Sequence, residues 1–109
     1  MRTRDVPLFT GISIGDRVLK VVTLREGIVA DTLTANEANK SGTDLELGLR
    51  ITAQRIKCID DIQGPMDVDL VRGMTETDYQ FLYEALQKFD EECEAEAREA
   101  LGLAAGGRG

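Results

Sequence analysis

The sequence predicts an α+β fold, in which an N-terminal β-hairpin packs on three helices and an acidic helical extension follows. Three observations support this prediction. Near the N-terminus, two segments rich in Ile, Val and Thr flank a turn that contains glycine, which is typical of a hairpin. Apolar residues recur at helical spacing through the middle of the chain. After residue 89, acidic residues largely replace apolar ones.

The two predicted strands are residues 8–14 and 17–25, and Gly15-Asp16 is the turn between them. Glycine readily adopts the positive φ that a two-residue hairpin turn requires. An isolated hairpin is only marginally stable in water, so one face of this hairpin must pack on the helices. The expected apolar face consists of Ile12, Ile14, Leu19 and Val21, or of the alternate positions.

The first helix is predicted over residues 29–39, where Val29 and Leu33 have helical spacing, as do Ala30 and Ala38. Asp31 lies in the first turn, where a negative charge complements the helix dipole. The basic residue and the glycine in segment 40–42 then end this helix.

A second helix is predicted from Thr43 or Asp44 to Ile62. The strict alternation in residues 45–51 also fits a strand. The apolar pattern continues to Ile62, however, which is too long for a typical strand and favours a helix. Because this helix is apolar on two sides, we expect it to be central, with Gly64-Pro65 and a short connector over residues 67–72 after it.

The third helix is predicted to begin at Thr75. The Thr75 hydroxyl is placed to accept a hydrogen bond from the backbone N–H of Asp78, and the Asp78 side chain is expected to reach back to the start of the same helix. Further along, apolar residues at helical spacing predict a stripe that faces the core. This stripe comprises Tyr79, Leu82, Ala85 or Leu86, and Phe89.

Two aromatic residues of the third helix, Phe81 and Tyr83, lie off this stripe and need another neighbour. Exposed aromatic side chains are typical of protein interfaces. The stripe itself is interpreted as core, with a partner surface as the alternative. The candidate partner-binding residues are therefore Phe81, Tyr83 and Phe89.

Three parts of the chain are distinguished: a flexible N-terminus over residues 1–7, a folded domain over 8–89, and an acidic helical extension with a disordered tail over 90–109. Gly106-Gly107 can be encoded by a run of guanines, and a ribosome can slip on such a run. The tail is therefore the candidate position for a ribosomal frameshift.

Composition argues against several function classes. The formal net charge of -7 repels phosphate backbones and anionic lipids, so neither nucleic acid nor a membrane is an expected partner. The chain has no histidine, and its carboxylates fall mostly in caps, connectors and solvated faces. We therefore expect no enzyme, no cofactor and no metal site. Cys58 and Cys93 are interpreted as reduced thiols of a cytosolic protein, with a disulfide as the alternative.

Four segments carry a resemblance to a known family. The junction 21–31 reads Val-Val-Thr-Leu-Arg-Glu-Gly-Ile-Val-Ala-Asp, and it is followed by the helical segment 45–59, the Gly64-Pro65 break and the helix start Met-Thr-Glu-Thr-Asp-Tyr-Gln-Phe-Leu at 74–82. In this order and spacing they resemble the tail assembly chaperones of Mu-like and P2-like contractile-tail phages, over about residues 10–89. Gly27 departs from the pattern, where a proline is common, and the acidic segment 90–100 is not part of it.

The resemblance implies a small protein of the bacterial host cytoplasm that binds the phage tape measure protein and helps to deliver it for polymerisation of the tail tube. It also leaves room for the tail tube protein as a second partner and for a homo-oligomer. The alternative is a minor tail or baseplate protein that stays in the virion. A small regulatory protein that binds basic host proteins is a third hypothesis, suggested only by the negative charge.

Overall fold

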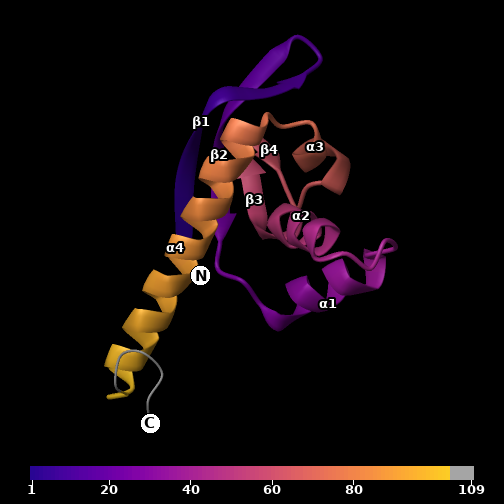
Figure 1. The fold of residues 1–109 in the computed structure, drawn as a ribbon. Helices are drawn as coiled ribbons and strands as arrows, with labels where there is room; N and C mark the ends of the chain where they lie inside the picture. The colour runs from indigo at the N-terminus through magenta and orange to yellow at the C-terminus, as the bar shows by residue number, and fades with distance from the viewer. Residues whose placement is uncertain (104–109) are drawn as a thin grey trace.

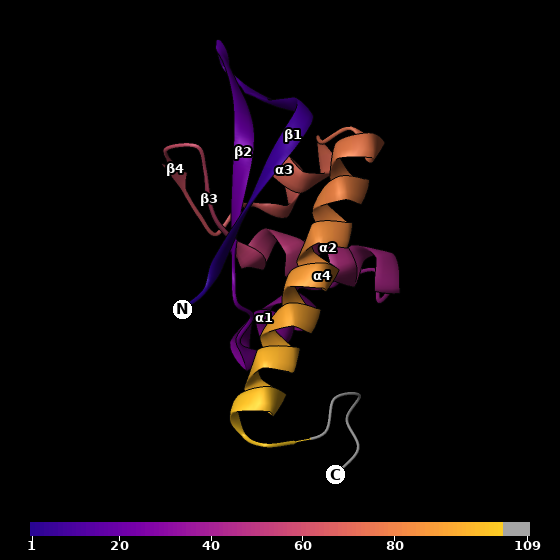
Figure 2. The same ribbon diagram turned by 90° about the vertical axis from the view of Figure 1, so that its left-hand side faces the viewer.

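A four-stranded antiparallel sheet and four helices make up the protein, as the computed structural model shows for residues 1–103 (Figure 1). The strands follow one another in the sheet in the order β1-β2-β3-β4. Helix α4 runs beside β1, and α2 packs against α1 and α3 (Figures 1 and 2). The predicted α+β class is thus confirmed. The elements are β1 (Thr3–Ile14), β2 (Arg17–Arg25), α1 (Val29–Ala38), α2 (Asp44–Arg55), β3 (Ile56–Ile59), β4 (Ile62–Gln63), α3 (Val68–Arg72) and α4 (Glu76–Ala100).

The predicted hairpin is present, with Gly15 at φ +58° in the turn between Ile14 and Arg17. Its tip projects beyond the helices (Figures 1 and 2). The buried face is only partly the expected one, because β1 and β2 change register between Pro7 and Ile12. Ile14 is exposed and Val21 half-buried, whereas the residues that face the core are Val6, Leu8, Ile12, Leu19, Val22 and Leu24.

Strand β1 begins at Thr3, so most of the segment expected as a flexible N-terminus lies in the sheet. Thr3 pairs with Arg25 across the ladder, and Val6 is buried. The physical reason is the alternation of the strand, which places Val6 and Leu8 on the core face of β1. The prediction of a flexible segment over residues 1–7 is therefore wrong for residues 3–7.

The second helix ends at Arg55, seven residues before the predicted end at Ile62, and the chain then forms β3 and β4. Strand β3 pairs with β2, with Cys58 opposite Thr23. The turn after β3 is held by Asp60, whose carboxylate accepts hydrogen bonds from the backbone N–H groups of Lys20 and Val21, each at 3.0 Å. The apolar run that indicated one long helix is therefore shared between a helix and a buried strand.

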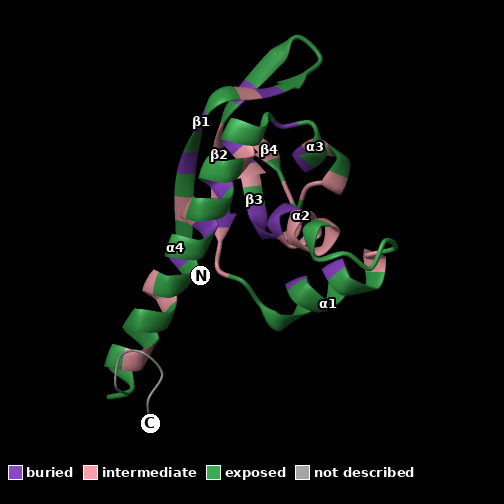
Figure 3. Cartoon of the chain, in the orientation of Figure 1, coloured by how far each residue is buried: buried purple, intermediate pink, exposed green. Residues whose placement is uncertain are grey.

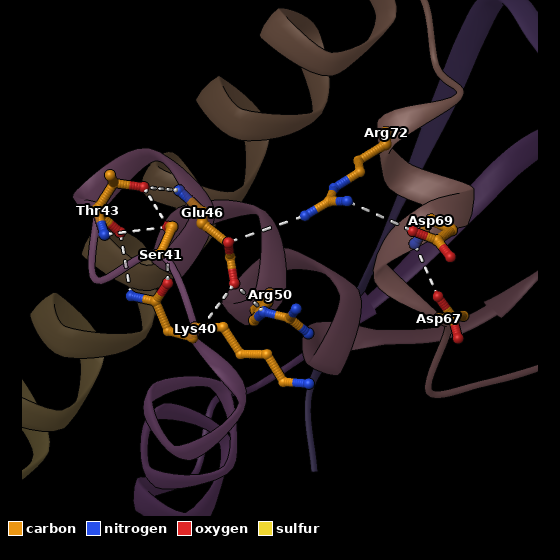
Figure 4. A network of polar contacts seen from close by, with 9 residues as sticks. Lys40, Ser41, Thr43, Glu46, Arg50, Asp67, Asp69 and Arg72 are labelled. Atoms are coloured by element: carbon orange, nitrogen blue, oxygen red, sulfur yellow. Dashed lines mark hydrogen bonds and ion pairs between the residues drawn. The ribbon is translucent and has the colours of Figure 1, made fainter.

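Figure 4 shows a polar network that joins the turn after α1 to helices α2 and α3. Thr43 caps α2 by accepting from the backbone N–H of Glu46, and the helix begins at Asp44, one of the two predicted starts. The Glu46 carboxylate accepts from Arg50 Nε at 2.7 Å and lies 3.9 Å from Arg72 on α3. Asp67 in turn accepts from the backbone N–H of Asp69 at the start of α3. The network fixes α3 against α2, just before the start of α4.

Helix α1 has the predicted extent but packs on its polar side. Ala35 and Asp31 are buried, and the Asp31 carboxylate accepts from Arg25 Nη2 at 2.6 Å and from the backbone N–H of Ile28 at 2.8 Å. Val29 and Leu33 point to solvent. Asp31 is therefore more than a charge at the helix start, because it attaches α1 to the end of β2.

Helix α4 continues without a break from Glu76 through the acidic segment to Ala100. Its buried residues Leu82, Leu86 and Phe89 face the sheet, and Figure 3 marks buried residues on α4 and on the strands beside it. Ion pairs attach the acidic part of α4 to the residue before β1, to β1 itself and to the end of α2. These pairs are Arg2 with Glu96, Arg4 with Glu92, and Arg55 with Asp90.

Gly106-Gly107 and the end of the predicted disordered tail lie outside the described residues. In the part of the chain that is described, no helix is long and apolar enough to cross a lipid bilayer.

Candidate partner-binding surface

Two exposed phenylalanines from distant parts of the chain lie on the same side of the molecule. Phe9 on β1 is 80% exposed and Phe81 on α4 is 51% exposed. Together with Val6, Pro7 and Leu8 they line an open hollow of about 450 Å³, which we call the aromatic hollow. Large exposed apolar side chains that gather at one place are typical of an interaction site.

The position of Phe9 depends on a carboxylate in the first turn of α4. Asp78 is fully buried, and Asp78 Oδ1 accepts from the backbone N–H of Phe9 at 2.8 Å. Asp78 Oδ2 accepts from the N–H groups of Thr10 at 3.1 Å and Gly11 at 2.9 Å. A carboxylate satisfied by several backbone donors is a strong and directional anchor. It holds three consecutive residues of β1 against α4.

These three residues belong to an irregular segment of the hairpin. Pro7 pairs with Val21 and Ile12 with Leu19, so that four residues of β1 lie opposite one residue of β2. Gly11 has φ +88°, and a Cβ atom there would lie 2.7 Å from the carbonyl oxygen of Leu19. Only glycine fits at this place. The irregular segment keeps Leu8 and Ile12 on the core side while Phe9 faces solvent.

The carbonyl group of Phe9 is also engaged, because Lys20 Nζ donates a hydrogen bond to it at 2.8 Å. Both backbone polar groups of Phe9 are thus bonded within the chain. What Phe9 offers to a partner is its side chain.

A second, larger groove of about 660 Å³ adjoins the aromatic hollow. Phe81 lines both of them, so they meet at this side chain. The groove runs from the start of α4 to α3 and α2. Its apolar lining consists of Leu49, Val71, Met74, Tyr79 and Phe81.

The other two candidate residues lie elsewhere. Tyr83 is 38% exposed, stacks on Tyr79 with the ring centroids 6.2 Å apart, and accepts a hydrogen bond from Gln87 Nε2. It is two residues after Phe81 and so lies about 200° away around the helix axis. Phe89 is fully buried, with the guanidinium groups of Arg2 and Arg4 over its ring. The structure therefore brings Phe81 together with Phe9, and not with Tyr83 or Phe89.

Sequence reasoning missed Phe9 and the long-range role of Asp78. A signal for Phe9 was present, because the alternation that places Val6 and Leu8 inside places Phe9 outside. Asp78 was expected to cap its own helix. Its N–H is indeed bonded to Thr75 Oγ1 at 3.2 Å, but its carboxylate bonds β1 instead.

Acidic residues on the two sides of α4 differ in whether they form ion pairs. On the side of β1, Arg4 lowers the pKa of Glu92 through a hydrogen bond and its positive charge. On the solvent side, four glutamates make no ion pair with any residue from 1 to 103. These are Glu76, Glu84, Glu91 and Glu99. A negatively charged face thus follows the helix that carries Phe81.

Both cysteines are free thiols. Burial raises the pKa of the Cys93 thiol, which keeps it protonated at neutral pH. Within residues 1–103, no group of three or more His, Cys, Asp or Glu side chains is arranged to hold a metal ion.

Comparison with known proteins supplies the family. A family model described as tail assembly protein gp41, of the Mu type, matches residues 8–102. The match includes the whole acidic segment 90–100 that the resemblance had left out, in agreement with the continuous helix α4. Comparison with curated proteins and with solved structures gave no significant match. Because the family model covers nearly the whole chain, the protein belongs to the tail assembly protein gp41 family of Mu-like phages.

Proposed function

We propose that this protein is a tail assembly chaperone, which binds the tape measure protein in the host cytoplasm before the tail tube polymerises and does not remain in the virion. Membership in a tail assembly family supports a role in tail morphogenesis. The observation that carries the finer proposal is the aromatic hollow, in which Phe9 and Phe81 are presented to solvent.

The hollow suits a binding role because it is held in place before any partner arrives. Asp78 fixes the backbone of residues 9–11, and α4 is anchored further along its length, at Glu92 and Asp90, by Arg4 and Arg55. Aromatic side chains on a rigid support contribute to binding without a large loss of conformational entropy. A chaperone that must hold an apolar segment of a long protein needs such a surface. The proposal requires no catalytic group, cofactor, nucleic acid or membrane.

Co-expression tests the proposal. The cognate tape measure protein is produced alone, with this protein, and with its Phe81→Ala variant, and its soluble fraction is compared. We expect the tape measure protein to stay in solution and to co-purify with the wild-type chain, and to do neither with Phe81→Ala. Leu33→Ala is the matched control, because Leu33 is also an exposed apolar residue on a helix, away from the hollow.

Two results would contradict the proposal. One is a tape measure protein that is equally soluble alone and does not co-purify with this chain. The other is stoichiometric presence of this chain in purified tails, which indicates the alternative role as a minor tail or baseplate protein.

A further inference from the structure

We propose that the occupant of the aromatic hollow is a basic amphipathic helix, whose apolar side covers Phe9 and Phe81 and whose Lys and Arg residues face the acidic solvent side of α4. This inference rests on the proposed function for the source of that helix, the tape measure protein. It adds the secondary structure and the charge of the segment that is bound.

The backbone around Phe9 argues against a partner that binds as a strand. Strand β1 is at the edge of the sheet, a position that often accepts an added strand. Here the N–H groups of Phe9, Thr10 and Gly11 are already bonded to Asp78, and the carbonyl of Phe9 to Lys20. An added strand would need such groups free. Recognition at the hollow therefore relies on side chains, as when an amphipathic helix lies in an apolar groove.

The charge of the partner follows from the residues beside Phe81. Glu84 lies one turn after Phe81, and Glu91 lies two turns after Glu84 on the same side of the helix. Lys88, between them, is the one basic residue of this stretch, so the local charge is negative. Basic residues of a partner helix would bring opposite charges together, which favours encounter and fixes orientation.

The same charges argue against a second copy of this chain as the occupant. Two copies meeting at the hollow would bring their solvent faces of α4 together, and each chain has a net charge of -7. Like charges placed together oppose association. A basic helix from another protein meets no such repulsion.

Designed peptides test this inference directly. Three synthetic peptides of about 20 residues are built from leucines and charged residues. The first is an amphipathic helix with Lys on its polar face, the second has Glu at those positions, and the third is a scrambled form of the first. Binding of each labelled peptide to the full chain is followed by fluorescence anisotropy at low and high salt.

We expect the Lys peptide to bind at least about tenfold more tightly than either of the others, with weaker binding at high salt. Phe81→Ala should weaken its binding by about tenfold or more. A Glu84→Gln and Glu91→Gln double variant should reduce the preference for the Lys peptide over the Glu peptide. The control Leu33→Ala should bind as the wild type does.

The inference is overturned if the Glu peptide or the scrambled peptide binds as tightly as the Lys peptide, if none of them binds, or if Leu33→Ala loses as much binding as Phe81→Ala. Co-purification separates this failure from failure of the proposed function. A tape measure protein that co-purifies equally with the wild type, with Phe81→Ala and with the glutamate double variant contradicts the docking mode and leaves the chaperone role intact. A tape measure protein that co-purifies with none of them contradicts the chaperone role itself.

Discussion

The carboxylate of Asp78 lies 2.8 Å from the backbone nitrogen of Phe9, which joins the first turn of α4 to a strand 69 residues earlier in the chain. Through this contact the start of the longest helix determines where an exposed aromatic side chain of β1 stands. Phe81 lies on the next turn of the same helix, so one short segment of α4 both positions Phe9 and supplies its neighbour.

Removal of the Asp78 side chain should destabilise the fold. Asp78→Ala leaves the N–H groups of Phe9, Thr10 and Gly11 without their acceptor, and we expect a loss of about 2–4 kcal/mol in the free energy of unfolding. Asp78→Asn keeps one acceptor oxygen and should lose less. Urea denaturation of the three proteins measures this order, and an Asp78→Ala variant as stable as the wild type would contradict it.

Because part of β1 is irregular, we expect alanine substitutions at two glycines with positive φ to lower the free energy of unfolding by different amounts. Gly11→Ala places a Cβ atom against the backbone of Leu19, so it should cost about 3 kcal/mol in the free energy of unfolding. Gly15→Ala meets no atom within 4 Å and should cost only about 1 kcal/mol, through its backbone conformation. Thermal and urea unfolding of both variants measure this difference. Equal losses in the free energy of unfolding would show that the close approach of Gly11 to Leu19 does not matter for stability.

Substitutions along α4 should separate folding from binding. Leu86 is buried, so Leu86→Ala should cost about 2–5 kcal/mol in the free energy of unfolding. Phe81→Ala removes a half-exposed side chain and should cost less than about 1 kcal/mol, while it weakens binding of the tape measure protein. Tyr83→Ala, on the other flank of the helix, tests whether the surface extends beyond the hollow. Equal losses of melting temperature in all three variants would remove the distinction.

The ion pair between Arg25 and Asp31 is expected to account for part of the stability that the fold loses at acidic pH. The hydrogen bond from Arg25 lowers the pKa of Asp31, and the N–H of Ile28 adds to this effect. Because the pKa in the folded state lies below the value of about 3.9 in the unfolded chain, the charged form adds stability above that pH. This stability is lost as the pH falls through the lower, folded pKa.

Asp31→Asn should therefore be less stable than the wild type at neutral pH and should lose less stability on acidification below about pH 4. The difference between the two free energies of unfolding should narrow as the pH falls below about 4 and towards the lowered pKa of the wild-type carboxyl. Urea denaturation across this pH range provides the measurement. If the two free energies of unfolding differ by the same amount at every pH, the charge of Asp31 does not contribute to stability.

Local signals explain what the sequence predicted correctly. The Gly15-Asp16 turn and the cap at Thr75 each depend on residues a few positions apart, and both are present. The exposure of Phe81 also followed from local helical spacing. Such features are encoded within one turn or one hairpin, so pattern reasoning is sufficient for them.

The errors involve contacts between distant segments. Residues 56–59 continue the apolar pattern of the helix before them, and only pairing with β2 makes them a strand. Asp78 resembles an ordinary helix-start residue, and its partners Phe9, Thr10 and Gly11 lie in another part of the chain. No spacing in the sequence indicates that the first strand and the last helix meet.

Site-specific photo-cross-linking during phage or prophage induction tests the central claim most directly. A photoreactive phenylalanine derivative replaces Phe81 in one variant and Leu33, as the control, in another. We expect a cross-link from position 81 to the tape measure protein before tubes form, and none from position 33. Absence of that cross-link, or equal cross-linking from both positions, would contradict the claim that this chain binds the tape measure protein through the aromatic hollow.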